Sequence, residues 1–246
     1  MNKLTTLSYF IFLLPFLGFI INGLFLKQSH KKLAGFLSVA LNGAAALIAI
    51  YLAFNYFQSG VAPGRMILWQ KDFLSFAPSL IASVGFLLDP LSAMMLVVIT
   101  FISFAVHIYS IGYMKEDRST TRFFSFLSLF TFSMLSLVVA PNLFQTFFFW
   151  ELVGISSYLL IGFWYEKPAA VSASKQAFIL TRFADSFFLL GIILVSFIIG
   201  SFDFYDLNTL SLSTLLGEIN LGIITITKAK ALFVASILIF IGGWGK

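Results

Sequence analysis

Residues 147–164 read FFFWELVGISSYLLIGFW, an almost unbroken apolar run that contains one acidic residue, Glu151. A helix needs about 20 apolar residues to cross a bilayer, and the stretch from 143 to 165 is long enough. Glu151 lies about 12 Å of helix beyond Leu143, so its carboxylate is expected near the middle of the membrane. A charge at that depth costs roughly 2.5 to 3.5 kcal/mol, which makes Glu151 a candidate functional residue. At helical spacing, Tyr158 and Gly162 share its face.

The composition excludes a water-soluble fold. Of 246 residues, 60% are hydrophobic and only 10% are charged, whereas a soluble surface needs about a quarter of its residues charged. The net charge of +5 is typical of the basic loops of membrane proteins, so no nucleic-acid partner is expected. Without cysteine the chain cannot form a disulfide or hold a Cys-ligated cluster, and its two histidines are far apart. We therefore expect no cofactor in this chain.

Apolar runs of spanning length recur along the sequence. They lie at 4–26, 33–57, 90–114, 123–140 and 143–165, and a sixth lies within 169–200. A shorter run at 231–244 predicts the start of a seventh helix. The fold class is thus an all-α membrane protein: a polytopic bundle of six full transmembrane helices and the beginning of a seventh, in one domain over 1–246. The first run is too long for a signal peptide, which predicts a retained helix.

Two connections are long enough to hold structure of their own. Residues 58–89 contain the β-prone runs Met66–Trp69 and Leu80–Leu88, which predict a short hairpin. Residues 201–230 mix acidic and apolar side chains and predict an amphipathic surface helix with a loop. Asp89, before Pro90, is expected to cap the third span, and Pro168 suits the first turn of the sixth.

The basic residues predict the orientation. The short odd-numbered connections hold most of them: Lys27, Lys31, Lys32, Lys115, Arg118, Arg122 and Lys167. The even-numbered side has its basic residues only in the two long connections. The positive-inside rule then places the N-terminus outside and the odd connections in the cytoplasm, in a multi-pass protein of the inner cell membrane.

Further charges lie where lipid is expected. Residues 174–188, SKQAFILTRFADSFF, place Arg182 and Asp185 three residues apart, close enough to pair within one helix. Lys175, on the same face as Arg182, can extend toward the interface. Lys246 follows Gly242, Gly243 and Gly245, which permit a bend or break in a membrane helix. Together with Glu151, these residues suggest a proton relay.

Each residue also has a structural interpretation. Glu151 can hydrogen-bond a neighbouring helix, and Arg182 with Asp185 can serve only to hold helices together. His107, near the end of the third span, suits a polar helix interface. The aromatic runs Phe147–Trp150 and Phe123–Phe124 suit lipid or core packing.

Six segments resemble one known family. They are LDPLSAMML (88–96), HIYSIGYM (107–114), RFFSFLSLF (122–130), WELVGISSYLLIGFW (150–164), KQAFILTRFADSFFLLGI (175–192) and GGWGK (242–246). In these segments the chain resembles the antiporter-like subunit L of respiratory complex I, the proton-translocating NADH:quinone oxidoreductase. Family members are much longer, so this chain is expected to correspond to their N-terminal half.

The resemblance implies roles for five residues. Glu151 matches the essential glutamate of the fifth helix, and Lys246 the lysine of a broken seventh helix that modulates it. Arg182 and Asp185 match an element that faces the neighbouring antiporter-like subunit, and His107 matches a histidine often present in the third helix. The implied function is proton translocation driven by remote quinone reduction, as a subunit of the enzyme without a redox centre of its own.

The implied partners are other membrane-arm subunits, especially the neighbouring antiporter-like subunit, the C-terminal half of subunit L, and the lipid bilayer. Two alternatives remain open. One is the large subunit of a multi-subunit Na⁺(K⁺)/H⁺ antiporter or of a membrane-bound hydrogenase. The other is a non-conducting assembly fragment.

Overall fold

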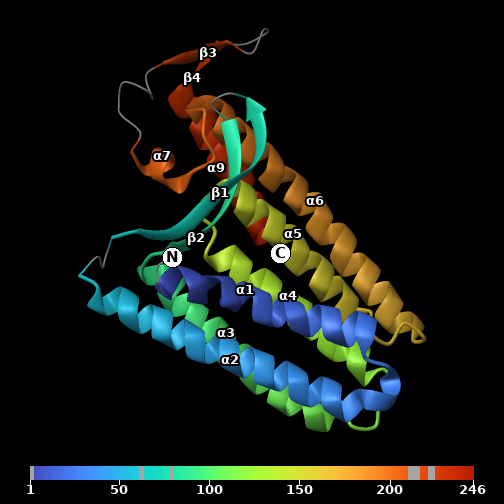
Figure 1. The fold of residues 1–246 in the computed structure, drawn as a ribbon. Helices are drawn as coiled ribbons and strands as arrows, with labels where there is room; N and C mark the ends of the chain where they lie inside the picture. Colours follow the sequence, from blue (N-terminus) through green and yellow to red (C-terminus); the bar gives the residue numbers. More distant parts are fainter. Residues whose placement is uncertain (1–2, 61–63, 78–79, 210–216, 221–224) are drawn as a thin grey trace.

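The computed structural model describes residues 3–60, 64–77, 80–209, 217–220 and 225–246. Its helices, in chain order, are α1 Lys3–Ile20, the π-helix η1 Ile21–Phe25, the 3-10 helix η2 Gln28–His30, α2 Lys31–Gln58, α3 Pro90–Tyr113, α4 Thr120–Val138, α5 Leu143–Ile161, α6 Pro168–Ile199, α7 Phe204–Asn208 and α9 Lys228–Trp244. Its strands are β1 Met66–Ala77, β2 Leu80–Leu88, β3 Glu218–Asn220 and β4 Thr225–Thr227. Figure 1 shows the arrangement.

Six helical segments are long and apolar enough to cross a membrane. They are Lys3–Phe25, Gln28–Gln58, Pro90–Tyr113, Thr120–Val138, Leu143–Ile161 and Pro168–Ile199. These segments confirm the six predicted spans. The predicted start of a seventh corresponds to α9, whose 17 residues begin three positions earlier than expected, at Lys228.

The starts of three helices follow from local sequence. Asp89 and Ser92 form a capping box on α3, in which each side chain accepts a 2.7 Å hydrogen bond from the other residue's backbone N–H. This confirms the predicted cap. Asn142 caps α5 by accepting from the backbone N–H of Gln145 at 2.8 Å. Pro168 occupies the first turn of α6, as expected.

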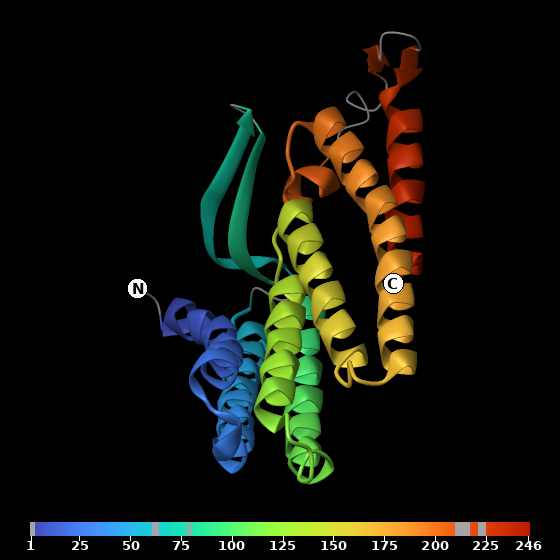
Figure 2. The same cartoon turned by 90° about the vertical axis from the view of Figure 1, so that its right-hand side faces the viewer.

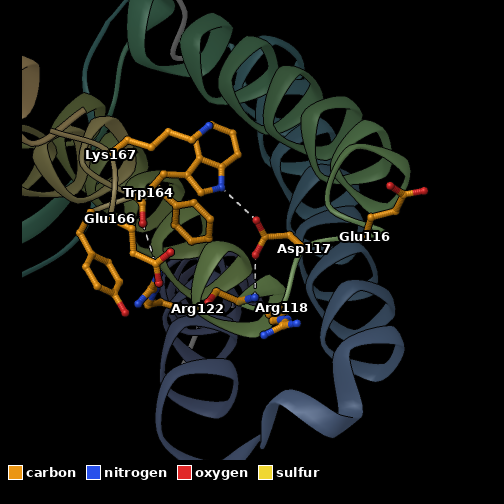
Figure 3. Close-up of a pocket in the computed structure, with 10 residues that line it drawn as sticks. Glu116, Asp117, Arg118, Arg122, Trp164, Glu166 and Lys167 are labelled. Carbon is orange, nitrogen blue, oxygen red and sulfur yellow. Dashed lines mark hydrogen bonds between the residues drawn. The ribbon is translucent and has the colours of Figure 1, made fainter. Parts of the chain in front are cut away.

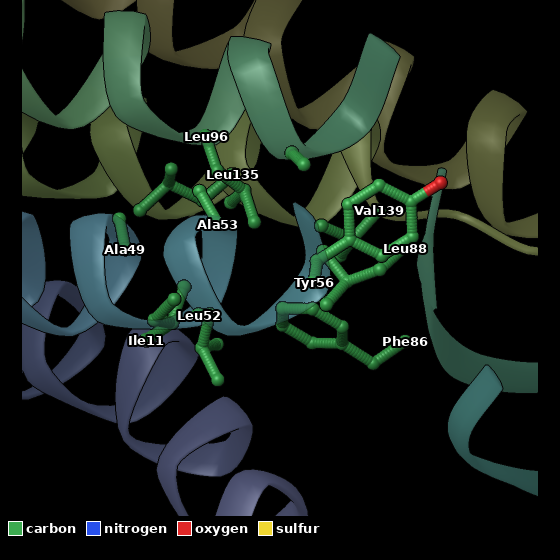
Figure 4. Packing of buried hydrophobic residues seen from close by; sticks show 11 residues of the cluster. Ile11, Ala49, Leu52, Ala53, Tyr56, Phe86, Leu88, Leu96, Leu135 and Val139 are labelled. Atoms are coloured by element: carbon green, nitrogen blue, oxygen red, sulfur yellow. The ribbon is translucent and has the colours of Figure 1, made fainter. Parts of the chain in front are cut away.

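The helices form two groups that lie side by side (Figure 2). Helices α1 to α4 share an apolar core that includes Ile11, Leu52, Tyr56, Leu96 and Leu135 (Figure 4). Helices α5, α6 and α9 share a second core around Phe188, Ile192, Val195 and Ala235. Two glycines allow α9 to approach α6 closely, because a Cβ at Gly191 would lie 2.7 Å from Ile239 Cγ1 and one at Gly242 would overlap Phe188.

The odd-numbered connections meet at one end of the bundle. Lys31 Nζ donates to the backbone O of Lys115 at 2.8 Å, and Trp164 Nε1 donates to Asp117 at 2.9 Å. The hairpin and the beginning of α1 lie at the other end, where Trp69 Nε1 donates to Ser8 Oγ at 3.0 Å. The spans therefore alternate in direction, as a polytopic bundle requires.

The predicted hairpin is present as the antiparallel pair β1 and β2, with Met66 opposite Leu88 and Ala77 opposite Leu80. Strand β1 continues to Ala77, well beyond the predicted Trp69. Gln145 on α5 connects the hairpin to the helices through side-chain hydrogen bonds. Its Oε1 accepts from Gly85 N at 2.7 Å, while its Nε2 donates to Gly85 O and Ser136 O, each at 3.1 Å.

The predicted amphipathic helix within 201–230 differs from the structure. Phe204–Asn208 is helical there and helix α9 begins at Lys228, while Glu218–Asn220 pairs with Thr225–Thr227 as a second small hairpin. The β-branched Ile and Thr residues of this segment favour strands over helix. Residues 210–216 and 221–224, which the prediction also covered, lie outside the described part of the chain.

A carboxylate joins the first hairpin to the connection after α6. Gln70 Nε2 lies 3.3 Å from Asp203 Oδ1; burial raises the pKa of Asp203, the hydrogen bond from Gln70 lowers it by less, and the charges of Asp206 and Asp72 add to the rise. A raised pKa means that the docked state favours the neutral carboxyl. The resulting stabilisation is complete below the ordinary pKa of aspartate and is lost as the pH rises through the raised value.

We therefore expect the hairpin amides of β1 to lose protection against hydrogen exchange as the pH rises from about 4, the ordinary pKa of aspartate, through the raised pKa of Asp203, after correction for intrinsic exchange rates. In the Asp203→Asn variant this pH dependence should disappear. An unchanged pH dependence in that variant would contradict the assignment to Asp203.

Candidate functional site

Four of the five predicted site residues converge where α5, α6 and the end of α9 meet. Arg182 on α6 forms an ion pair with Glu151 on α5. Arg182 Nη2 and Lys246 Nζ each lie 3.7 Å from Asp185 Oδ2. The charges therefore alternate in the order Glu151, Arg182, Asp185, Lys246, and we call these four residues the charge cluster. The predicted pairing of Arg182 with Asp185 is present, within one helix.

Burial differs along the charge cluster. The Asp185 side chain is 2% exposed, whereas those of Glu151 and Arg182 are 23% and 26% exposed. A carboxylate as buried as Asp185 needs paired charges and hydrogen bonds to offset its loss of hydration. Two cations face Asp185 Oδ2 and one N–H group donates to Oδ1, while Oδ2 accepts no hydrogen bond from the described residues. Asp185 is therefore the anchor of the cluster, and Glu151 is its more accessible acid.

Trp150 is a site residue that the sequence analysis missed, because it was interpreted as packing material. Its Nε1 donates to Asp185 Oδ1 at 2.6 Å, and its backbone O accepts from Lys246 Nζ at 2.5 Å. Its ring also lies 4.8 Å from the Lys246 ammonium. The available signal was the indole N–H, which needs a hydrogen-bond partner when it is buried in a membrane span.

Gly154 gives the two cations access to α5. A Cβ at this position would lie 2.5 Å from Arg182 Nη2 and 3.0 Å from Lys246 Nζ. Arg182 Nη2 also donates to the backbone O of Glu151 at 3.1 Å, and its guanidinium lies 4.9 Å from the Phe178 ring. Any larger residue at 154 displaces at least one of these cations.

The glycines before Lys246 lie in a continuous helix. Helix α9 runs through Gly242 and Gly243 to Trp244, so no break precedes Lys246 among the described residues. Cβ atoms at Gly242 and Gly245 would overlap Phe188 and Ala184 of α6. These two glycines bring the end of α9 against α6, and this contact positions Lys246.

The two residues expected on the same face of α5 as Glu151 also contact α6. The Tyr158 ring packs on Phe178, with centroids 5.1 Å apart, and Gly162 faces Ser174. Lys175 is exposed, in agreement with the expected interfacial position. Beside Lys246, a cavity of about 250 Å³ is lined by the hydroxyl residues Ser157, Tyr158 and Thr181. This volume accommodates several water molecules next to the ammonium group.

His107 does not join the charge cluster. It is fully buried between α2, α3 and α4, where Nε2 lies 3.1 Å from Asn42 Nδ2 and Nδ1 lies 2.7 Å from the backbone O of Ser103. The structure thus places His107 in the first group of helices, whereas the charge cluster belongs to the second.

A polar pocket of about 400 Å³ lies between the α3–α4 and α5–α6 connections (Figure 3). Asp117 accepts there from Trp164 Nε1, and Arg122 donates to the backbone O of Phe163 at 3.2 Å. Its acidic residues, Glu116, Asp117 and Glu166, balance its basic residues, Arg118, Arg122 and Lys167. These contacts tie two connections of the same end together, and in the described part of the chain no three His, Cys, Asp or Glu residues are grouped as metal ligands.

The fold and the charge cluster define a polytopic membrane protein with paired charges between its helices. The sulfane sulfur reductase MBS, an archaeal respiratory membrane complex, contains a chain that superposes with TM-score 0.74 at 19% identity, over 98% of this chain and 44% of that one. A chain of the Mrp complex from Dietzia superposes with TM-score 0.76 at 18% identity, over 98% of this chain and 23% of that one. At these identities the likeness shows the fold.

Sequence comparison is more specific. Residues 73–124 match the family "NADH-Ubiquinone oxidoreductase (complex I), chain 5 N-terminus", and residues 140–244 match the family "NADH:quinone oxidoreductase/Mrp antiporter, TM". NADH-quinone oxidoreductase subunit L of Rickettsia bellii is 38% identical over 98% of this chain and 36% of its own length. Chloroplastic NAD(P)H-quinone oxidoreductase subunit 5 of Marchantia polymorpha is 42% identical over 81% of this chain and 29% of its own length.

The chain therefore belongs to the family of antiporter-like subunits L and 5 of NADH-quinone oxidoreductases, and it matches their N-terminal part. It spans about a third of the length of these curated relatives. Glu151, Arg182 and Asp185 lie in the second matched segment, and His107 lies in the first.

Proposed function

We propose that this chain is part of a proton-translocating membrane-arm subunit of NADH:quinone oxidoreductase, with no redox centre of its own. The observation that carries the proposal is the charge cluster, which places two acids and two bases in alternation between three apolar helices. Intramembrane ionisable residues that pair with one another mark proton relays. The family membership of the chain supports the same function.

The geometry suggests how the charge cluster moves a proton. Arg182 lies between two carboxylates and pairs with both. When Arg182 shifts toward Asp185, Glu151 loses its cation and its carboxylate takes up a proton, because a poorly hydrated carboxyl without a positive neighbour favours the neutral form. When Lys246 pairs with Asp185 instead, Arg182 returns to Glu151. The Glu151 carboxyl then releases its proton.

The free energy needed to move a proton across the membrane is similar to the free energy of rearranging one buried ion pair. Moving one charge against about 150 mV costs about 3.5 kcal/mol. Breaking a buried ion pair by removing one partner costs about 3 to 5 kcal/mol. The free energy of rearranging one pair in the charge cluster is therefore large enough to drive one proton across the membrane.

His107, predicted from the resemblance as a further site residue, stays a prediction in this mechanism.

The proposal also covers location and partners. The seven basic residues of the odd connections lie at the end of the bundle opposite the start of α1, which favours an N-terminus outside the inner cell membrane. The expected partners are the remainder of subunit L, the neighbouring antiporter-like subunit and the bilayer. We propose that residues 1–246 act as one domain in this assembly.

The test is Glu151→Gln in the intact complex, in membrane vesicles that oxidise NADH. We expect the proton gradient formed per NADH oxidised to fall at least about tenfold, because loss of an acid–base group typically costs about 10²- to 10⁴-fold. The matched control is Glu116→Gln, which removes a carboxylate at the α3–α4 connection and should leave the gradient unchanged.

Two other outcomes would reject the proposal. Normal pumping in the Glu151→Gln variant would favour a structural, non-conducting role. Sodium or pH sensitivity of the cells with normal NADH oxidation would favour a cation/proton antiporter.

A further inference from the structure

A row of hydrogen-bonded polar side chains crosses the α1–α4 group, apart from the charge cluster. Asn22 Nδ2 donates to Ser38 Oγ at 2.6 Å, and Asn42 Nδ2 donates to the backbone O of Ser38 at 2.9 Å. Asn42 Nδ2 also lies 3.1 Å from His107 Nε2. All four side chains are at most 1% exposed. We call Asn22, Ser38, Asn42, His107 and Ser103 the polar row.

The hydrogen bonds of His107 define its protonation. Nδ1 lies 2.7 Å from the backbone O of Ser103, which only accepts, so Nδ1 carries the hydrogen. Nε2 then accepts from Asn42, and the ring is neutral. Beyond it, Ser103 Oγ pairs with Thr131 Oγ1 on α4 at 2.5 Å. The row thus links η1, α2, α3 and α4.

Two buried acceptors in this row have no protein partner. Asn22 Oδ1 and Asn42 Oδ1 are both fully buried, and neither has a hydrogen-bond partner among the described residues. An unsatisfied buried polar atom costs about 1 to 3 kcal/mol. Both amides contact the same serine, Ser38. Buried water usually satisfies such groups when several polar atoms are close together.

The outer end of the row opens to the surface. Asn22 belongs to the π-helix η1, and it lines a hollow of about 400 Å³ together with Gln28, Thr121 and Ser125. Short π-helices occur frequently at functional sites. This hollow lies at the end of the bundle where the odd-numbered connections meet, and the buried side chain of Asn22 borders it.

We propose that the polar row is a hydrated path that carries water from the η1 hollow to His107, a route separate from the charge cluster. Its use as a proton path rests on the proposed function. A proton delivered by water adds to His107 Nε2, and the Asn42 amide turns so that its free Oδ1 accepts from the new N–H. Return of the proton to water restores the neutral ring.

The chain suits a thiol test because it contains no cysteine. Ser38→Cys and Ser103→Cys place nearly isosteric thiols on the path, and Ser133→Cys places one at a fully buried serine of α4 whose hydroxyl donates to the backbone O of Leu129. The probe is the silver ion, applied to the intact complex in native membranes. Unreacted thiols are then labelled with a maleimide after denaturation, and the mass of this chain is measured.

We expect Ser38→Cys and Ser103→Cys to react with silver at least about ten times faster than Ser133→Cys, since thiols react where water and ions reach them. Adding Asn42→Leu should abolish the reaction of Ser103→Cys and leave that of Ser38→Cys unchanged. Equal, slow reaction of all three thiols would overturn the proposal. So would a Ser103→Cys reaction that Asn42→Leu does not slow, because water would then arrive by another route.

The readout is independent of the proposed function. Silver reaches a hydrated path whether or not the complex pumps protons, so a loss of the path and a loss of pumping in Glu151→Gln are separate results.

Discussion

Replacing Asp185 with asparagine is expected to destabilise the junction of α5, α6 and α9 by about 3 to 5 kcal/mol. The variant removes the carboxylate that faces Arg182 and Lys246 and accepts from Trp150. Two cations then share one acid, Glu151, and a buried N–H group weakens its hydrogen bond. The measurement is the thermal unfolding midpoint of the purified complex, together with the amount of this chain in the membrane.

The double variant distinguishes a charge network from independent contacts. Arg182→Gln combined with Asp185→Asn leaves one cation and one acid, Lys246 and Glu151, so its loss of stability should be smaller than the sum of the two single losses. Additive losses would show that the two residues do not act as a pair. Lys175→Gln on the same helix is the control, and it should have little effect because Lys175 is exposed.

Replacing Gln145 with leucine is expected to destabilise the protein by about 3 kcal/mol and to release the hairpin β1–β2. The leucine fills similar space, yet it leaves Gly85 N, Gly85 O and Ser136 O without the hydrogen bonds that Gln145 provides. Hydrogen exchange at the β2 amides measures this release. Thr146→Val is the control, because the hydroxyl of Thr146 donates to the backbone O of Asn142, one turn earlier at the start of the same helix. Equal protection of β2 in both variants would contradict the role of Gln145.

The features that the sequence predicted well depend on local chemistry. The six spans follow from apolar length, and the cap at Asp89 and the first turn at Pro168 follow from neighbouring residues. The pair of Arg182 and Asp185 follows from helical spacing. The two small strands after α7 were missed because their short β-branched segment was interpreted together with its acidic neighbours.

The features that the sequence did not predict depend on contacts between helices. The ion pair of Glu151 with Arg182 joins two helices, and no local spacing predicts which helices pack together. The same is true of Lys246, which reaches Trp150 across 96 positions of sequence. Gly154 illustrates the reason: its importance comes from two cations on other elements, and a lone glycine in a span has many interpretations.

The π-helix Ile21–Phe25 is a point in the first span where one residue can be deleted without changing the register of the helix before it. The bond from Leu26 N to Ile21 O encloses one residue more than an α-helical turn does. Deleting one residue here converts the wide turn into a regular one, so the rest of α1 keeps its register against α4. The same deletion in the middle of α4 would rotate every later side chain by about 100° and turn its polar face away from its neighbours. A deletion of one residue is therefore better tolerated at the end of the first span than within α4.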